Sequence, residues 1–215
     1  MSPADSVWTS TVKQFTDRTA SASPTPGGGS VAAVTVVFAG SLIVMCLEIA
    51  KKSLGESRIR VPLHRVEEAC RIARKCADED IVVFDAYISA SRLPKATAVE
   101  GARRESARTT ALVKATKVPL GCVQAAISIA EAAIESKQLI PSVILSDWAS
   151  GLALIRAALA SLLFNVAVNL RSLPKSKNND ALRKKYEDIL LQTGDTVLAI
   201  GVALDDVTQR LGVAL

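Results

Sequence analysis

The stretch from Val31 to Leu47 constrains the fold more than any other part of the chain. Its 17 residues carry no charged side chain and are interrupted only by Thr35, Gly40 and Ser41. That length is the lower limit for a helix that spans a membrane. Glu48 closes the run, however, and the other helical segments are amphipathic. We therefore predict a helix buried at the centre of a bundle, and no membrane contact.

A loop rich in proline and glycine leads into this helix. The segment from Ser23 to Ser30 reads SPTPGGGS. Proline holds the chain extended, and Gly27, Gly28 and Gly29 let the backbone approach another surface closely. Ser30 is the predicted N-cap. Two interpretations stay open: a cradle whose free N–H groups bind an anion or a polar ligand head, and a tight turn between two packed helices. GGGS matches neither the phosphate loop nor the dinucleotide fingerprint.

Composition and periodicity predict an all-α fold. The chain is 49% hydrophobic and only 4% aromatic, which favours an Ala-rich bundle whose helices approach closely. No segment alternates as a strand does. A length of 215 residues fits one domain, 1–215. We expect about seven helices, over residues 5–20, 31–52, 62–91, 97–118, 119–135, 148–171 and 181–211.

Charge argues against a nucleic-acid partner. The net charge of +5 is distributed over separate clusters, and no aromatic residues alternate with the basic ones. Most of these clusters are interpreted as solvated helix faces, although some of them could attract an acidic ligand.

Cysteine and histidine usage limits the chemistry. Cys46, Cys70, Cys76 and Cys122 form no CxxC pair, which indicates reduced thiols in a cytoplasmic protein. The single histidine, His64, excludes a multi-histidine metal site, so no metal is expected. The polar segment 1–25 has no apolar signal-peptide region.

Asp80 is the clearest polar residue in an apolar position. Steps of four, three and four along the third predicted helix join Ala73, Ala77, Asp80 and Phe84 on one face. A carboxylate there either pairs with a cation and is structural, or is desolvated and has a raised pKa. The second state suits a general acid/base near neutral pH.

Two further polar pairs have alternative interpretations. Asn165 and Asn169 are four residues apart on one face of an apolar helix. Their amides either hold a neighbouring helix or read a heterocyclic amide in a pocket. Ser146 and Asp147 either cap that helix or contact a ligand.

These motifs, in this order, resemble the formiminotetrahydrofolate cyclodeaminase / methenyltetrahydrofolate cyclohydrolase family. The resemblance covers about residues 12–171. It is carried by PTPGGGSVAA, by Asp80 four residues before Phe84, by RLPKAT with Arg104 and KVPL downstream, and by Ser146-Asp147 followed by NVAVN at 165–169.

The resemblance implies a helical domain that forms a homodimer and binds a tetrahydrofolate derivative as substrate, without a metal. Asp80 matches the family's proposed catalytic residue. The remaining matched positions imply substrate contacts, with Lys95 or Arg104 meeting the glutamate tail; they are Gly27, Gly28, Gly29, Ser30, Lys95, Arg104, Ser146, Asp147, Asn165 and Asn169.

The resemblance implies one of two reactions. A cyclohydrolase interconverts 5,10-methenyltetrahydrofolate and 10-formyltetrahydrofolate, whereas a cyclodeaminase forms the methenyl compound from 5-formiminotetrahydrofolate and releases ammonia. Both use the same cleft and proton transfers, so the sequence does not choose between them. Glu48, Ala50 and Ile140-Pro141 depart from the family pattern. They motivate a second hypothesis, the same chemistry on a non-folate imine or amidine; a third is a non-catalytic helical dimer that binds a partner protein.

Overall fold

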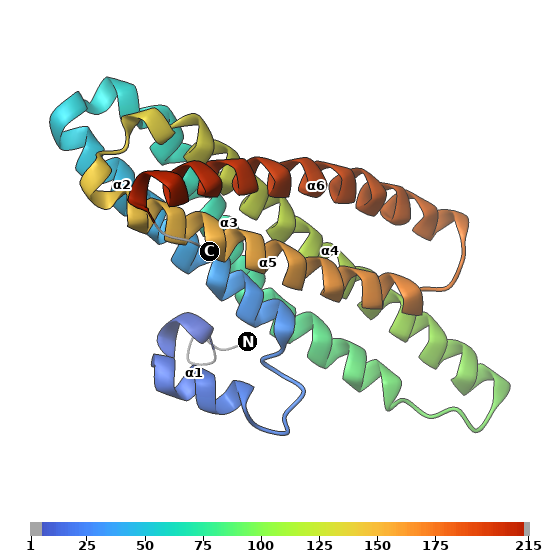
Figure 1. Cartoon of the computed structure of the whole chain (residues 1–215). Coiled ribbons are helices and arrows are strands. Elements are labelled where there is room, and N and C mark those ends of the chain that lie inside the picture. Colours follow the sequence, from blue (N-terminus) through green and yellow to red (C-terminus); the bar gives the residue numbers. More distant parts are fainter. Residues whose placement is uncertain (1–5, 213–215) are drawn as a thin grey trace.

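Five long helices run back and forth along one direction and form the body of the molecule (Figure 1). The structure is a computed structural model that describes residues 6–212, apart from the side chains of 177 and 178. The elements are η2 (Val7–Thr9), α1 (Val12–Thr19), α2 (Gly28–Leu54), α3 (Glu56–Ser91), α4 (Ala98–Glu135), η3 (Lys137–Leu139), η4 (Ser142–Ile144), α5 (Leu145–Ser172) and α6 (Lys177–Leu211). The all-α prediction is confirmed, since the described residues contain no strand.

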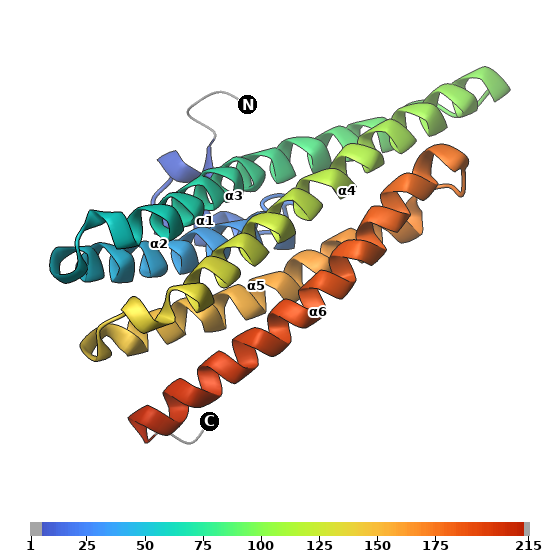
Figure 2. The ribbon, with the colours of Figure 1, turned by 90° about the horizontal axis from the view of Figure 1, so that it is seen from above.

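Helices α2 to α5 pack in a ring, and α6 lies along α4 and α5 (Figure 2). The core between them is rich in buried alanine, as the composition predicted. Small residues let the helices approach closely: Gly40 of α2 faces the Cys70 thiol of α3, and Gly151 of α5 faces Ile43 of α2. The helix predicted at the centre is α2, which packs against α3 and α5. It is a member of the ring and is not buried on all sides, since Phe38 and Met45 are exposed.

The hairpin of α3 and α4 is longer than the rest of the bundle. Helix α3 has 36 residues and α4 has 38, whereas α2 has 27 and α5 has 28. Both views show the tip of this hairpin projecting past the start of α2 and the end of α5 (Figures 1 and 2). We call the part from Asp85 to Arg108 the α3–α4 arm.

The expected count of about seven α-helices is one too high, because Pro119 lies inside a continuous α4 instead of starting a new helix. Proline lacks the N–H that would bond the carbonyl four residues earlier, here that of Ala115. The side chain of Asn169 supplies this bond, since its Nδ2 donates to Ala115 O at 2.9 Å. The α4 backbone therefore stays satisfied and continues. Likewise Pro62 lies within α3, which begins at Glu56.

The N-terminal segment is divided where one helix was predicted. A short turn at Val7–Thr9 precedes α1, which begins after a capping box formed by Thr11 and Gln14. The predicted start at Asp5 lies outside the described residues. Asp78 of α3 anchors this segment by accepting bonds from Ser6 Oγ at 2.7 Å and the Val7 N–H at 2.9 Å. Asp78 therefore fixes the start of the described chain on α3.

Among the described residues, three helical segments are long and apolar enough to cross a membrane, judged by length and composition alone: Gly28–Leu54, Ala98–Glu135 and Ser142–Ser172. In the first two, 61% of the most apolar window is buried inside the bundle, against 39% in the third. The lower value reflects apolar side chains that α5 exposes beside those of α2. We call this surface the α2–α5 face; its large exposed residues are Phe38, Met45, Leu154, Phe164 and Val168.

The close approach of α5 to α2 predicts a stability effect at Gly151. A Cβ there would lie 2.8 Å from Ile43 Cδ1 and 3.1 Å from the Ala39 carbonyl oxygen, so Gly151→Leu should lower the free energy of unfolding by about 1–3 kcal/mol through overpacking. Urea denaturation measures this change. The control is Gly194→Leu on α6, where a Cβ meets nothing within 4 Å and leucine improves helix propensity. Equal stabilities of the two variants would contradict the packing described.

Candidate active site

The lengths of the helices place the glycine loop beside Asp80. Gly29 lies 26 residues before the α2–α3 turn at Gly55, and Asp80 lies 25 residues after it. Because α2 and α3 are antiparallel neighbours with the same rise per residue, these positions meet at the same height. The same reasoning applies to α4 and α5, and it brings Ala115 level with Asn165.

The Asp80 carboxylate lies against the N-terminus of α2. A Cβ on Gly29 would overlap the Asp80 carboxyl group, so only glycine permits this approach. The Ser30 backbone N–H, one of the helix-terminal donors without an intrahelical acceptor, bonds the carboxylate. The loop therefore binds an anion, as one interpretation proposed, but the anion belongs to the protein.

Burial controls the charge of this carboxylate. Desolvation raises the pKa of Asp80 from 3.8 to about 6, and the bond from Ser30 acts in the opposite direction without cancelling it. Asp80 forms no salt bridge among the described residues. Of the two states open at the sequence level, the structure therefore has the desolvated one. Such a group can both accept and donate a proton near neutral pH.

Ser30 differs from its predicted role. The N-cap of α2 is Gly27, three residues earlier, and no side chain caps the helix. The Ser30 side chain is fully buried, and its Oγ donates to the Ala77 carbonyl of α3 at 2.9 Å. A second bond, from Thr25 Oγ1 to Asp85 Oδ1 at 3.1 Å, ties the loop to α3. Ser30 thus ties the start of α2 to α3 through its side chain, while its backbone N–H bonds the Asp80 carboxylate.

The two asparagines lie at the same cavity. Asn165 is next to the loop: its Nδ2 would be 3.4 Å from a Cβ on Gly28, and it donates to Ser161 O at 2.8 Å. Asn169 donates to the Ala115 carbonyl that Pro119 leaves without a partner. Asn169 therefore joins α5 to α4, as one interpretation predicted, and both amides also line the cavity. The recognition of a heterocyclic amide stays a prediction.

The cavity has a volume of about 320 Å³ and combines a few polar groups with an apolar wall. The apolar lining residues were not predicted as site residues, although Phe84 belongs to the Asp80 motif, Phe164 precedes Asn165 and Val168 precedes Asn169. The lining residues are Pro24, Thr25, Gly27, Gly28, Gly29, Asp80, Val83, Phe84, Ala115, Phe164, Asn165, Val168 and Asn169.

Ser146 and Asp147 are not brought into this cavity. They occupy the first turn of α5, whereas Asn165 is near its other end. At 1.5 Å per residue the two ends are roughly 28 Å apart. Asp147 lies in the first turn, where a negative charge favours the helix dipole. The interpretation of the two residues as caps is wrong, because the N-cap of α5 is Ile144 and no side chain caps this helix.

Lys95 and Arg104 lie on the α3–α4 arm and not at the cavity. Lys95 is exposed in the connection between the two helices. Arg104 donates from Nε at 3.0 Å and from Nη2 at 2.6 Å to the Ser91 carbonyl at the end of α3. Ser91 is 11 residues beyond Asp80, or roughly 16 Å along the helix. A ligand would contact them only if it extended out of the cavity.

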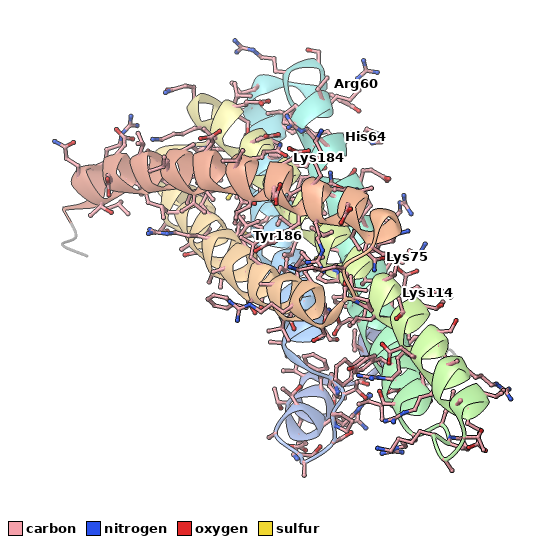
Figure 3. All side chains as sticks on the ribbon, turned by 90° about the vertical axis from the view of Figure 1, so that its right-hand side faces the viewer. Arg60, His64, Lys75, Lys114, Lys184 and Tyr186 are labelled. Carbon is pink, nitrogen blue, oxygen red and sulfur yellow. The ribbon has the colours of Figure 1, made fainter. Side chains whose placement is uncertain are left out.

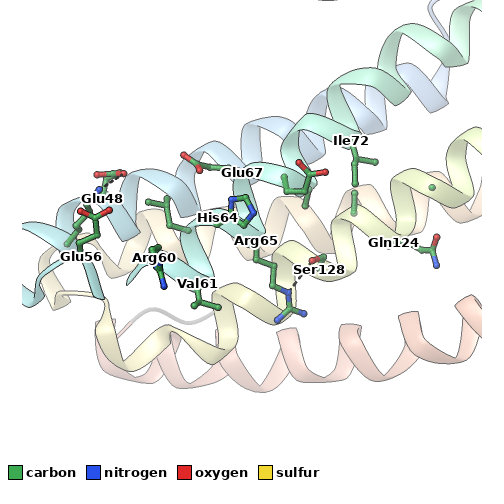
Figure 4. A pocket seen from close by; sticks show the side chains of 16 residues that line it. Glu48, Glu56, Arg60, Val61, His64, Arg65, Glu67, Ile72, Gln124 and Ser128 are labelled. Carbon is green, nitrogen blue, oxygen red and sulfur yellow. Dashed lines mark hydrogen bonds and ion pairs between the residues drawn. The ribbon is translucent and has the colours of Figure 1, made fainter. Parts of the chain in front are cut away.

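A larger hollow of about 1060 Å³ lies between α3 and α4 near the opposite end of the bundle (Figure 4). Its wall mixes acidic and basic side chains, including Glu48, Arg60 and Arg65, and Arg65 is bound to Ser128 and to two glutamates. His64 projects from the outer surface of α3 and is exposed (Figure 3). This hollow has no buried titratable group comparable to Asp80, so we take the smaller cavity as the candidate site.

No group of three or more histidine, cysteine, aspartate or glutamate side chains in the described part of the chain could hold a metal ion. The lining of the cavity combines the Asp80 carboxyl group, two amides and an apolar wall.

Comparison with known proteins gives a consistent result. A family model described as "Formiminotransferase-cyclodeaminase" matches residues 11–188. A methenyltetrahydrofolate cyclohydrolase of Methylorubrum extorquens is 32% identical over 191 residues, which are 86% of this chain and 90% of that protein. The formimidoyltransferase-cyclodeaminase of Sus scrofa is 26% identical over 92% of this chain, which spans only 37% of that longer protein.

A solved structure shares the fold. The crystal structure of formiminotetrahydrofolate cyclodeaminase from Thermotoga maritima has a TM-score of 0.80, with 21% sequence identity, and the match covers 94% of this chain and 99% of that one. On the family-model match and the 32% identical relative, the chain belongs to the formiminotransferase-cyclodeaminase family.

Proposed function

We propose that this protein is a one-carbon folate enzyme that interconverts 5,10-methenyltetrahydrofolate and 10-formyltetrahydrofolate, with Asp80 as its catalytic acid/base. The observation that carries the proposal is the Asp80 carboxylate, desolvated and without a salt bridge in the described structure, in a cavity that also presents two amides. The similarity to a cyclohydrolase of nearly the same length supports the choice of substrate.

Asp80 would move the proton in both halves of the reaction. As a carboxylate it removes a proton from the water that attacks the methenyl carbon. As a carboxylic acid it returns this proton to N5 when the C–N5 bond breaks. The hydroxyl group of the adduct loses its own proton to solvent as the formyl C=O forms on N10, so hydrolysis releases one proton overall. A pKa of about 6 suits both steps, because neither protonation state is strongly disfavoured near neutral pH.

The polar groups around Asp80 would orient the pterin. The Asn165 and Asn169 amides each use one N–H on a backbone carbonyl, so their carbonyl oxygens and remaining N–H groups can serve the ring. Gly27 and Gly28 would let the ring approach the backbone, and Phe84 and Phe164 offer apolar surface to its faces. Lys95 and Arg104 are proposed to attract the acidic end of the substrate; Ser146 and Asp147 are not included in the proposed site of one chain.

The cyclodeaminase reaction is the second candidate, because the Thermotoga maritima structure that shares this fold carries that name. There N10 attacks the formimino carbon. Asp80 protonates the amino group of the resulting adduct, which then leaves as ammonia, so the activity would be that of a lyase. The same cavity serves both reactions, and assays with both substrates separate them.

We also propose that the protein is a homodimer that pairs through the α2–α5 face. This face carries large exposed apolar side chains, including Phe38, with an exposed fraction of 54%, and Phe164, with 70%. Exposed apolar surface of this kind marks an interaction site. Phe164 also lines the cavity, so a second copy on this face would cover the site.

The remaining features of the proposal concern the setting of the enzyme. Residues 1–215 are taken as one catalytic domain that acts in the cytoplasm, without metal, nucleic acid or membrane. The four cysteines are buried free thiols, which suits a reducing compartment.

The first prediction concerns Asp80→Asn. The amide keeps the size of the side chain and an acceptor for the Ser30 N–H, but it transfers no proton, so kcat should fall by roughly 10²–10⁴. The decay of methenyltetrahydrofolate absorbance measures the rate. Equal rates in the two proteins would remove Asp80 from the mechanism. No turnover of either folate substrate by the wild type would instead favour a non-folate imine or a non-catalytic role.

The second prediction is a pH-dependent difference in stability. Because the pKa of Asp80 is raised to about 6, the folded protein binds the carboxyl proton more tightly than the unfolded chain does. The stability that this proton contributes is fully present below about pH 4 and is lost as the pH rises through 6. Asp80→Asn should therefore gain stability relative to the wild type across this window, by an amount on the order of 2–3 kcal/mol. Urea unfolding of both proteins at pH 4 and pH 7 measures it; a constant difference would show that the pKa is unshifted.

The third prediction concerns the dimer. A charge at the centre of the α2–α5 face should prevent pairing, so sedimentation should show Phe38→Glu as a monomer and the wild type as a dimer, with lower activity in the variant. Val202→Glu on α6, where the wild-type side chain is 71% exposed, is the matched control and should remain dimeric. A monomeric wild type, or dissociation by Val202→Glu alone, would contradict the proposed interface.

A further inference from the structure

The candidate cavity is small for the proposed substrate. Its volume of about 320 Å³ is near the lower limit of cavities that bind small molecules, roughly 300–1,000 Å³. A pterin and its one-carbon unit are of that scale, whereas a whole folate also carries a benzoyl ring and a glutamate with two carboxylates. This part has to leave the cavity and lie on the surface. A binding site for this part of the substrate rests on the proposed function.

A continuous polar and aromatic face leads from Asp80 onto the α3–α4 arm. Steps of four, three and four join Asp80, Phe84, Tyr87 and Ser91 on one face of α3. Phe84 lines the cavity, and its ring lies against that of Tyr87, with centroids 6.2 Å apart and planes inclined by 46°. Tyr87 is roughly 10 Å from Asp80 along the helix axis, a distance that an extended benzoyl-glutamate reaches from the pterin.

Arg108 of α4 is held beside Tyr87. Its Nη2 donates to the Tyr87 phenol oxygen at 3.2 Å, and its guanidinium carbon lies 5.7 Å from the centre of the Tyr87 ring. The third contact, Nη1 to Glu105 at 3.1 Å, is to a side chain that is 58% exposed, where an ion pair adds little. The Arg108 Nε is buried and has no acceptor in the described structure.

The charge of this region fits an acidic ligand. Residues 91–108 contain five basic and two acidic side chains, a net charge of +3 out of +5 for the whole chain. The other surfaces beside the cavity do not offer this net positive charge. The α2–α5 face presents apolar side chains, and the cavity with Lys114 and Lys117 on its wall also carries Asp78 and Glu79, which would repel a carboxylate.

We propose that Arg108, positioned by Tyr87, binds a carboxylate of the substrate's glutamate. Phe84 and Tyr87 contact the benzoyl ring, which lies between the cavity and Arg108. A carboxylate accepts two parallel N–H bonds from one guanidinium, which is a better partner than the exposed Glu105. Arg104 already donates to the Ser91 carbonyl, so its main role is to tie α4 to the end of α3.

Two substrates and three variants test this assignment. The pair is methenyltetrahydrofolate and methenyltetrahydropteroate, which differ only in the glutamate. Arg108→Gln should raise KM for the folate roughly 10- to 100-fold, with kcat and the pteroate KM nearly unchanged. Tyr87→Phe, which removes only the phenol group, should give a smaller rise. Lys114→Gln, an exposed cation on the same helix, is the control and should change neither KM.

Binding of p-aminobenzoylglutamate, measured by calorimetry, reports on the same contact without any reaction. The wild type should bind it, and Arg108→Gln should not. A wild type that binds this probe but converts neither substrate would overturn the proposed reaction and leave the carboxylate site intact. Equal KM values for both substrates in the wild type, or a loss of discrimination in Lys114→Gln and not in Arg108→Gln, would overturn the site.

Discussion

The contact between the Asp80 carboxylate and the N-terminus of α2 is the interaction on which the site depends. A helix start leaves backbone N–H groups without partners, and a buried carboxylate needs donors, so each satisfies the other. The contact forms because Gly29 has no side chain in the way. Yet the donation from Ser30 does not outweigh desolvation, and the pKa stays near 6. The result is an acid that is fixed in position and still able to exchange its proton.

A second pairing explains two motifs that are distant in the sequence. Pro119 withdraws an N–H from the helix, which leaves the Ala115 carbonyl free at the cavity, and Asn169 of α5 donates to it. The proline of one motif and the asparagine of the other are therefore parts of one joint between α4 and α5. The joint fixes the end of α5 that also presents Asn165 beside the glycine loop.

Local pattern predicted most of the fold and the main polar residues that meet at the cavity, Asp80, Asn165 and Asn169. The interrupted apolar stripe marked Asp80, and helix lengths between turns place it opposite the loop. The helix predicted to begin at residue 97 is confirmed as α4, which starts with a capping box formed by Thr97 and Glu100. The wrong predictions concern segments whose structure depends on a residue distant in the sequence. Asn169 bonds α4 beside Pro119 and the helix continues, and Asp78 accepts bonds from Ser6 and Val7 where the predicted N-terminal helix is divided. Sequence motifs also do not give distances, so Ser146 and Asp147 were grouped with residues at the opposite end of α5.

The position of Asp80 links fold to chemistry through one quantity, the affinity of its carboxylate for a proton. Desolvation by burial raises its pKa to about 6, although the bond from the Ser30 N–H of α2 acts in the opposite direction. Carbon-13 NMR of aspartate-labelled protein, with Asp80→Asn to assign the signal, measures this pKa directly. The account predicts a carboxyl resonance that titrates with a midpoint near pH 6. A midpoint near 3.8, the ordinary value for aspartate, would contradict it.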